Sequence, residues 1–306
     1  MPVDRRANVP RWRECSAPSS VPPEAVLPAV PRPVVQLFSS RYIAGETLDD
    51  AVRVVRRLNA EGLLATIDVL GEEIKHADEA RAITRAYLDV FGAIERERLD
   101  SNISVKLTAL GLTLSYDLCK ENVLDVLTQG RFVRIDMEDS TTTDATLRLY
   151  RDLREAGHDN VGVVLQARLR RTLDDVRALA DLKPNVRLCK GIYLEPPSLA
   201  YTGADSIRTS FVQCLDALLD AEAYVALATH DEALIQEGLR REVPEFQMLL
   251  GVREERAREL VAAGHPMRIY VPFGEQWYAY SLRRLQENPA MATTIARSTL
   301  GRMLRL

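Results

Sequence analysis

Eight short apolar runs, separated by longer charged segments, dominate the chain between residues 63 and 273. Within each run Val, Ile and Leu follow one another almost without interruption, which is typical of strands buried on both faces of a parallel sheet. Strands with one face in solvent would alternate polar and apolar residues instead. We therefore predict eight buried strands, at residues 63–70, 103–107, 131–137, 161–167, 186–191, 224–229, 245–250 and 267–273.

The segments between these runs carry signals for helices. Gly157 and Gly264 each follow a charged amphipathic segment, at the place where a glycine often ends a helix. Thr172 precedes acidic residues and is predicted to cap a helix amino terminus. A further amphipathic segment at residues 47–62 precedes the first strand, and a last one covers residues 275–288. Helices are therefore expected to alternate with the strands.

Eight strand–helix units over about 240 residues match a (β/α)8 barrel in number and in length. A doubly wound open sheet is the alternative, and it would predict a glycine-rich turn after an early strand. The sequence contains no GxGxxG and no Walker motif. We predict an α/β fold, a TIM-type (β/α)8 barrel over residues 41–306 with an extra N-terminal helix. Residues 1–40, rich in Pro, Arg and Ser, are expected to form a disordered extension.

Charge and cysteine content exclude several classes of protein. The 40 Lys and Arg residues against 44 Asp and Glu residues give a net charge of −4, which argues against a nucleic-acid partner. The four cysteines show no CxxC or metal-type spacing, which favours free thiols in a reducing compartment. No apolar run approaches the roughly 18 residues of a membrane span. We expect a cytoplasmic protein without a transmembrane segment.

Polar residues gather where the predicted strands end, which is where barrel enzymes place their chemistry. Burying such groups costs several kcal/mol each unless they are paired, so their presence needs a reason. They are Lys106, Arg134, Asp136, Glu138, Asp139, Gln166, Arg187, Lys190, Gly191, Tyr193, Thr229, His230, Gln247 and Tyr270. The pattern indicates a polar site at the carboxyl end of the barrel.

The residue types alone leave several interpretations open. Lys106 and Lys190 could pair with Asp136 and Glu138 in a purely structural ion network. Either lysine could instead form the Schiff base of an aldolase. The two carboxylates could mark a metal site, although no histidine accompanies them at ligand spacing. A phosphate-bearing cofactor would use lysine, arginine and the helix start after the sixth strand.

Short strings in this sequence resemble the proline dehydrogenase family. They follow one another in the family's order between Arg41 and Leu306, and eight strings in series make the resemblance specific. The strings are ISVKLTALGL, FVRIDMEDS, VVLQARLRRT, NVRLCKGIYLEP, ATHDE, EFQMLLGVR, RIYVPFG and YSLRRLQENPA.

The resemblance implies a distorted (β/α)8 barrel that binds FAD non-covalently and without a Rossmann fold. It implies oxidation of L-proline to pyrroline-5-carboxylate, by hydride transfer from the ring carbon beside nitrogen to FAD. A membrane quinone would then reoxidise the flavin, with the enzyme lying peripherally on the inner face of the membrane. The resemblance is to the monofunctional type, so a separate pyrroline-5-carboxylate dehydrogenase would continue proline degradation to glutamate.

The matching motifs imply roles for individual residues. Catalytic roles fall to Lys106, Asp136 and Arg187, where Arg187 would stabilise negative charge on the flavin. Contacts or support for FAD fall to Asp136, Gln166, Arg187, Cys189, Lys190, Gly191, Ile192, Tyr193, Thr229 and His230. The proline pocket would be formed by Lys106, Leu249, Tyr270, Tyr280, Arg283, Arg284 and Glu287.

The sequence departs from the family's pattern at a few positions. Ile192 stands where the family usually has a small residue, and Leu194 stands where some members have Trp. The stretch between residues 230 and 246 is short, which predicts a short sixth helix after the sixth strand. Two other functions stay open: a barrel lyase or aldolase with a Schiff-base lysine, and a catalytically inactive relative that only binds a partner.

A pair of adjacent arginines marks the last predicted helix. Tyr280, Arg283, Arg284 and Glu287 occupy positions i, i+3, i+4 and i+7, which share one helical face. An ordinary surface ion pair between Arg283 and Glu287 is one interpretation. Because the helix follows the eighth strand, the two guanidinium groups could instead hold the substrate carboxylate between them.

Overall fold

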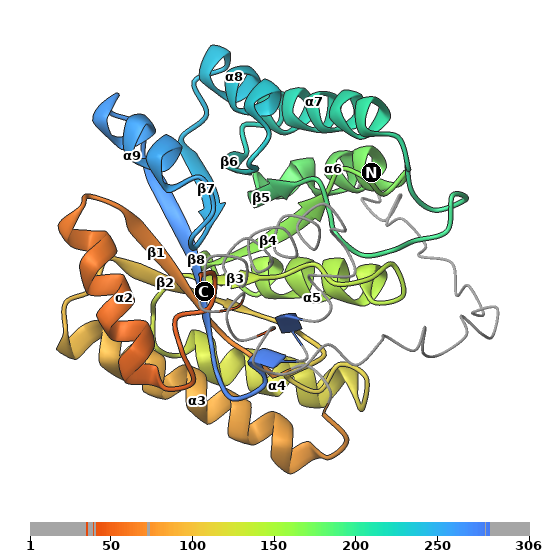
Figure 1. The fold of residues 1–306 in the computed structure, drawn as a ribbon. Helices are drawn as coiled ribbons and strands as arrows, with labels where there is room; N and C mark the ends of the chain where they lie inside the picture. Colours follow the sequence, from red (N-terminus) through yellow and green to blue (C-terminus); the bar gives the residue numbers. More distant parts are fainter. Residues whose placement is uncertain (1–34, 36–38, 40, 72–73, 279, 282–306) are drawn as a thin grey trace, which may run out of the picture.

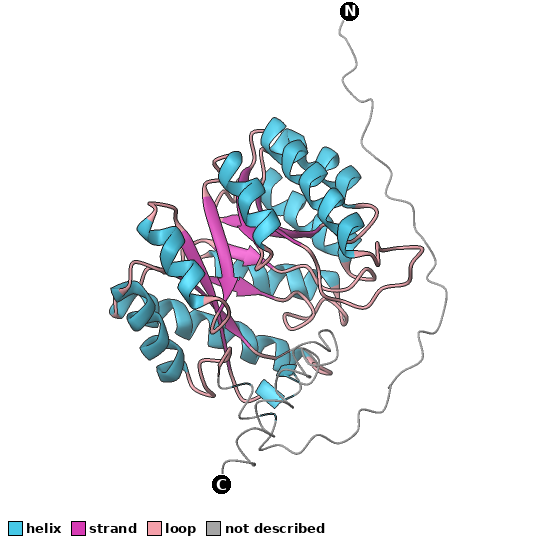
Figure 2. Ribbon diagram, turned by 45° about the horizontal axis from the view of Figure 1, so that its top comes forward, coloured by secondary structure: helices cyan, strands magenta, loops and turns pink. Residues whose placement is uncertain are grey.

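The computed structural model describes residues 35, 39, 41–71, 74–278 and 280–281, and in it eight parallel strands close into a barrel. The strands follow one another around the barrel in chain order, and the first pairs with the eighth. Helices surround the strands on the outside (Figures 1 and 2). The predicted (β/α)8 barrel is therefore confirmed, and helix α2 (Leu48–Ala60) is the extra helix before the first strand.

All eight predicted strands exist, with small shifts at their ends. They are β1 (Leu64–Val69), β2 (Ser101–Val105), β3 (Val133–Ile135), β4 (Val161–Gln166), β5 (Asn185–Cys189), β6 (Tyr224–Ala228), β7 (Glu245–Leu249) and β8 (Met267–Phe273). The helices between them are α3 (Ala77–Arg96), α4 (Tyr116–Leu127), α5 (Thr143–Glu155), α6 (Thr172–Leu179) with the short 3-10 helix η1 (Ala180–Leu182), α7 (Ala204–Asp220), α8 (Glu232–Arg240) and α9 (Glu254–Ala262).

Local signals explain most helix ends. Gly157 and Gly264 follow the caps of α5 and α9 with φ of +90° and +87°, a left-handed conformation that glycine adopts without strain. Thr172 was wrongly predicted as a cap, since it is the first residue of α6 and Arg171 precedes it. The Thr172 hydroxyl donates instead to the carbonyl of Gln166, at 2.6 Å, and ties the helix start to the end of β4.

The two faces of the strands differ in chemistry. Outward residues such as Ile67, Val105 and Val163 are fully buried against the helices and belong to the main apolar core. Inward residues are largely polar, because alternate positions along a strand point to opposite faces. Around one level of the barrel interior the paired residues are Asp68, Ser104, Arg134 and Gly162. The barrel is thus held by apolar packing outside and by polar pairing inside.

Gly162 leaves the space that the long side chain of Arg134 occupies. A Cβ atom on Gly162 would lie 2.4 Å from Arg134 Nη1 and 2.7 Å from the ring of Phe132. Arg134 is 2% exposed and its guanidinium is fixed by bonds to Val163 and Asn185, so it cannot simply swing aside. A glycine inside a strand here marks a close approach of another side chain.

We predict that Gly162→Ala destabilises the barrel by about 1–3 kcal/mol through overpacking. The matched control is Gly92→Ala in α3, where a Cβ would meet nothing within 4 Å. Since glycine in an exposed helix interior is unfavourable, the control should gain roughly 0.5–1 kcal/mol. Urea unfolding of both variants measures the two changes. Stability changes of the same sign and size would contradict this role of Gly162.

Candidate active site

Five charged or polar side chains meet inside the carboxyl end of the barrel. Lys106 Nζ lies 2.7 Å from Asp68 Oδ2 and 3.8 Å from Asp136 Oδ2. Arg187 Nη1 donates to Asp136 Oδ1 at 2.7 Å, and Tyr270 donates its hydroxyl proton to Asp136 Oδ2 at 2.8 Å. Three residues with predicted catalytic roles and one predicted substrate residue are therefore brought together, with Asp136 at the centre.

The pKa values of the two carboxylates of this cluster are shifted in opposite directions. Burial raises the pKa of Asp68 above its ordinary value, even though Lys106 opposes the rise. Burial acts on Asp136 in the same direction, but Arg187 and Lys106 outweigh it and hold the pKa of Asp136 below its ordinary value. The structure thus keeps Asp136 as a carboxylate beside two cations.

A chain of hydrogen bonds fixes Arg187 from the side of the amino-terminal end of the barrel. Its Nε donates to Gln247 Oε1 at 2.6 Å, and Gln247 Nε2 donates to Glu245 Oε1 at 2.5 Å. Glu245 is in turn held by Arg268, with contacts of 3.0 and 2.9 Å. The guanidinium of Arg187 also lies over the ring of Tyr270, 5.3 Å from its centroid. Arg187 is therefore positioned on both sides before any ligand binds.

A second group of predicted residues forms a cradle where β4 and β5 end. Gly191 has φ of +91°, and a Cβ there would lie 2.7 Å from Gln166 Oε1 and 3.0 Å from Arg168 Cδ. Gln166 is buried and donates to the carbonyl of Glu138 at 2.7 Å. Arg168 donates to the carbonyl of Tyr193, while its buried Nε has no partner among the described residues. An unpaired buried donor beside a glycine indicates a place for a polar ligand.

Ion pairing and capping organise the segment where β6 ends. Lys190 and Arg208 both pair with Asp231, which also caps α8 by accepting from the amide of Ala233. Thr229 accepts from the amide of Asp231 at 3.1 Å. Burial alone would raise the pKa of Asp231, but bonds from Arg208 and Lys190 lower it to about 2. This segment is a charged rim beside the cradle, and α8 is short, as predicted.

His230 connects the predicted cofactor and substrate residues. Its Nε2 accepts from the amide of Leu249 at 3.0 Å, and its carbonyl accepts from Arg253 at 2.7 Å. Leu249 is the last residue of β7 and pairs with Tyr270 of β8. The imidazole therefore holds the end of β7 against the barrel mouth.

Those remaining predicted residues that the structure describes lie at the edges of the site. Cys189 ends β5 and is partly buried, and Ile192 is 38% exposed. Tyr280 is buried and packs with Tyr42 and Leu70. The predicted residues Arg283, Arg284 and Glu287 lie outside the described part of the chain.

Sequence reasoning missed two residues of the site. Asp68 is fully buried and is the direct partner of Lys106, and Tyr87 donates to it at 3.1 Å. An acid inside an otherwise apolar strand was the available signal, the same one that identified Asp136. Arg168 gave no comparable signal, because it lies among several arginines in a loop.

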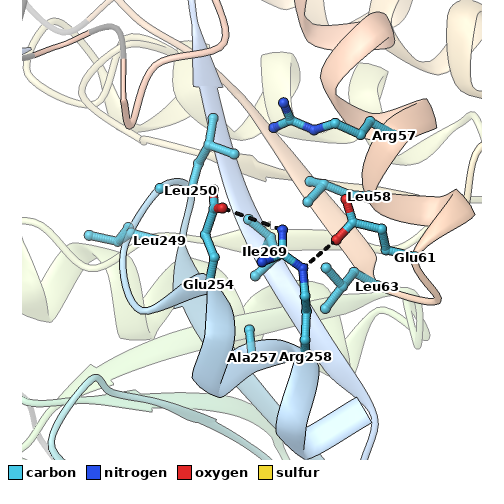
Figure 3. Close-up of a pocket in the computed structure, with 11 residues that line it drawn as sticks. Arg57, Leu58, Glu61, Leu63, Leu249, Leu250, Glu254, Ala257, Arg258 and Ile269 are labelled. Carbon is cyan, nitrogen blue, oxygen red and sulfur yellow. Dashed lines mark hydrogen bonds and ion pairs between the residues drawn. The ribbon is translucent and has the colours of Figure 1, made fainter. Parts of the chain in front are cut away.

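A small cavity between α2 and α9 is too small for a ligand. It is lined in part by Leu58, Ala257 and Ile269 and holds about 10 Å³, roughly the space of one water (Figure 3). Arg258 bridges Glu61 and Glu254 beside it, so the cavity belongs to the packing of these helices.

Comparisons with known proteins find one family. The family described as proline dehydrogenase matches residues 51–297. Proline dehydrogenase 1 of Bacillus subtilis (strain 168) is 38% identical over 277 residues, 87% of this chain and 91% of that protein. Proline dehydrogenase of Deinococcus radiodurans is 33% identical over 301 residues, 90% of this chain and 97% of that protein.

A solved structure agrees with the fold. It is that of proline utilization A (PutA) from Bdellovibrio bacteriovorus, inactivated by N-propargylglycine, with a TM-score of 0.74 and 26% identity. The match covers 83% of this chain and 33% of that one, so this chain spans about a third of the larger protein.

We predict that Lys106→Met costs about 3–5 kcal/mol of unfolding free energy, because it leaves Asp68 buried without its cation. The matched control is Lys183→Met, since Lys183 pairs with Glu222 at the surface, where the side chains are 64% and 72% exposed. The control should lose about 1 kcal/mol or less. Urea unfolding measures the stability loss of both variants. Equal losses would show that the Lys106–Asp68 pair contributes no more to stability than an exposed ion pair does.

We predict that the Asp231 carboxylate contributes acid-dependent stability. Its folded pKa of about 2 lies below the ordinary 3.8, so the contribution is fully present above pH 3.8 and is lost as pH falls through about 2. Asp231→Asn keeps the helix cap but removes the charge. The stability difference between wild type and variant should therefore shrink in this range. Denaturant unfolding at stepped pH, with Asp89→Asn as an exposed control, measures it, and a pH-independent difference would contradict the assignment.

Proposed function

The chain belongs to the proline dehydrogenase family and oxidises proline, and we propose that bound FAD receives the hydride. The family assignment carries the reaction, and the buried cluster around Asp136 supports its place in the barrel. The proposed product is pyrroline-5-carboxylate. Barrel enzymes of unrelated function also place their sites at this end, so the fold alone would not identify the reaction.

The residues at the cradle fit a flavin cofactor. Gly191 lets the backbone take a φ of +91° close to Gln166 and Arg168, and the unpaired Nε of Arg168 offers a ligand a donor. We propose that Asp136, Gln166, Arg187, Cys189, Lys190, Gly191, Ile192, Tyr193, Thr229 and His230 contact or support FAD. When bound, the flavin accepts the two electrons and the hydrogen that proline loses. Arg187 supplies a fixed buried cation that stabilises negative charge there.

The substrate side is proposed to lie between the Asp136 cluster and the end of the chain. Lys106, Leu249, Tyr270 and Tyr280 are proposed to line the proline pocket. Burial and Asp136 are the main causes that raise the pKa of Tyr270. Tyr280 lies close enough to Tyr270 to add to this rise. Arg283 and Arg284 are proposed to bind the proline carboxylate, with Glu287 orienting one of them.

Asp68 and Asp136 determine what Lys106 can do. The amine of Lys106 is engaged by both carboxylates, whereas a Schiff-base lysine must attack as an unpaired neutral amine. The lyase alternative therefore lacks a suitable nucleophile at this position. We propose that Lys106 acts as a positioned positive charge and that the buried walls exclude water from the reacting atoms.

The electron acceptor and the location are further parts of the proposal. A membrane quinone is proposed to reoxidise the flavin, and a separate pyrroline-5-carboxylate dehydrogenase to use the product. Within the described part of the chain, none of the helices has the length and the apolar character to cross a bilayer. We propose that the protein reaches the quinone by contact with the membrane surface from the cytoplasmic side.

Release of the cofactor tests the proposed flavin. The purified protein should be yellow, and heat denaturation should release FAD at about one equivalent per chain, identified by chromatography against FAD and FMN standards. A protein that oxidises proline after purification without any flavin would contradict the proposal.

We predict that Arg283→Ala raises KM for proline about 10- to 100-fold while FAD stays bound, because a charge-assisted pair contributes about 1.5–3 kcal/mol. Arg85→Ala, an exposed arginine of α3, is the matched control and should leave KM unchanged. Steady-state kinetics with an artificial electron acceptor measures both. An unchanged KM with full flavin content would place the carboxylate site elsewhere.

A further inference from the structure

A cavity of about 350 Å³ opens at the amino-terminal end of the barrel, opposite the candidate active site. Its wall comes from the first residues of seven strands or from the turns before them, and we name it the amino-terminal cavity. The lining residues that matter most are Asn102, Arg131, Phe132, Arg134, Glu245 and Arg268. A volume of this size lies within the range of small-molecule sites in proteins.

Three arginines line this cavity against two carboxylates, Asp100 and Glu245, so its positive charges are only partly compensated. Arg268 is paired with Glu245 through two contacts. Arg134 is 2% exposed, and its Nη atoms donate to the carbonyls of Val163 and Asn185 and to the Asn185 amide oxygen. Its Nε is buried and has no partner among the described residues. A cation in this position is costly unless an anion joins it.

Arg131 adds a second cation that is available to a ligand. Arg131 lies in the turn before β3 and is half-buried, and it forms no ion pair with any described residue. Phe132 and Tyr224 give the cavity aromatic surface, and Leu64 and Leu99 give it apolar surface. The amide of Asn102 is held by Thr66, which donates to its Oδ1 at 2.6 Å. The wall thus combines unpaired positive charge with ring-binding surface.

We propose that the amino-terminal cavity binds a small organic anion, whose carboxylate or phosphate group pairs with Arg131 and Arg134. The apolar and aromatic surface would hold the body of the molecule. Burial and the nearby Arg187 lower the pKa of Arg134, and the negative charge of Glu245 opposes this shift only in part. The site is independent of the proline reaction, although Glu245 joins its floor to Arg187 through Gln247.

Calorimetric titration of the flavin-loaded protein with inorganic phosphate and with benzoate tests the site. Binding of phosphate alone indicates a site for phosphate esters, and stronger binding of benzoate than of phosphate indicates a ring-bearing carboxylate. Benzamide, the neutral counterpart of benzoate, should not bind. Either anion binding at one site per chain supports the proposal.

Variants locate the binding. Arg131→Gln should weaken it at least tenfold, and Asn102→Asp should do the same by adding a negative charge in the shape of the original side chain. Arg85→Gln removes one exposed arginine elsewhere and should change nothing. Proline oxidation should persist in all three variants, which shows that they fold. No binding of either anion to wild type, or equal affinity in Arg131→Gln and Arg85→Gln, would overturn the proposal.

Discussion

The buried ion pair between Asp136 and Arg187 is the interaction on which the interior of this barrel depends. Removing Asp136 would leave the buried Arg187 without an ion pair among the described residues, and removing Arg187 would leave Asp136 with Lys106 alone, 3.8 Å away. Each partner is held again by others: Asp136 by Tyr270 and Lys106, Arg187 by Gln247. Such pairs add little net stability compared with apolar packing, so their presence is better explained by what they position.

The polar interior connects the two ends of the barrel. From Lys106 at one mouth, contacts run through Asp136, Arg187 and Gln247 to Glu245 and Arg268 at the other. A chain of this kind keeps side chains in single orientations, because each group satisfies its neighbour in a low-dielectric interior. The candidate active site and the amino-terminal cavity therefore rest on one connected set of side chains.

The sequence was sufficient for the architecture because eight apolar runs with helical segments between them admit few topologies. The sequence also predicted that polar residues gather at the strand ends, and the structure brings Lys106, Asp136, Arg187 and Tyr270 together there. Some partners of these residues could not be predicted. The Lys106–Asp68 pair depends on the register between β1 and β2, which no local pattern reveals. The place of Gly162 against Arg134 depends likewise on how β3 and β4 align.

Anaerobic rapid mixing with L-proline tests the central claim, that the ring hydride of proline passes to a flavin held in this barrel. The flavin absorbance should fall on mixing, at a rate no slower than turnover. Deuterium on the ring carbon that donates the hydride, which lies beside the nitrogen, should slow this fall. A flavin that stays oxidised while proline is consumed, or a bleaching rate that deuterium leaves unchanged when chemistry is limiting, would contradict the account.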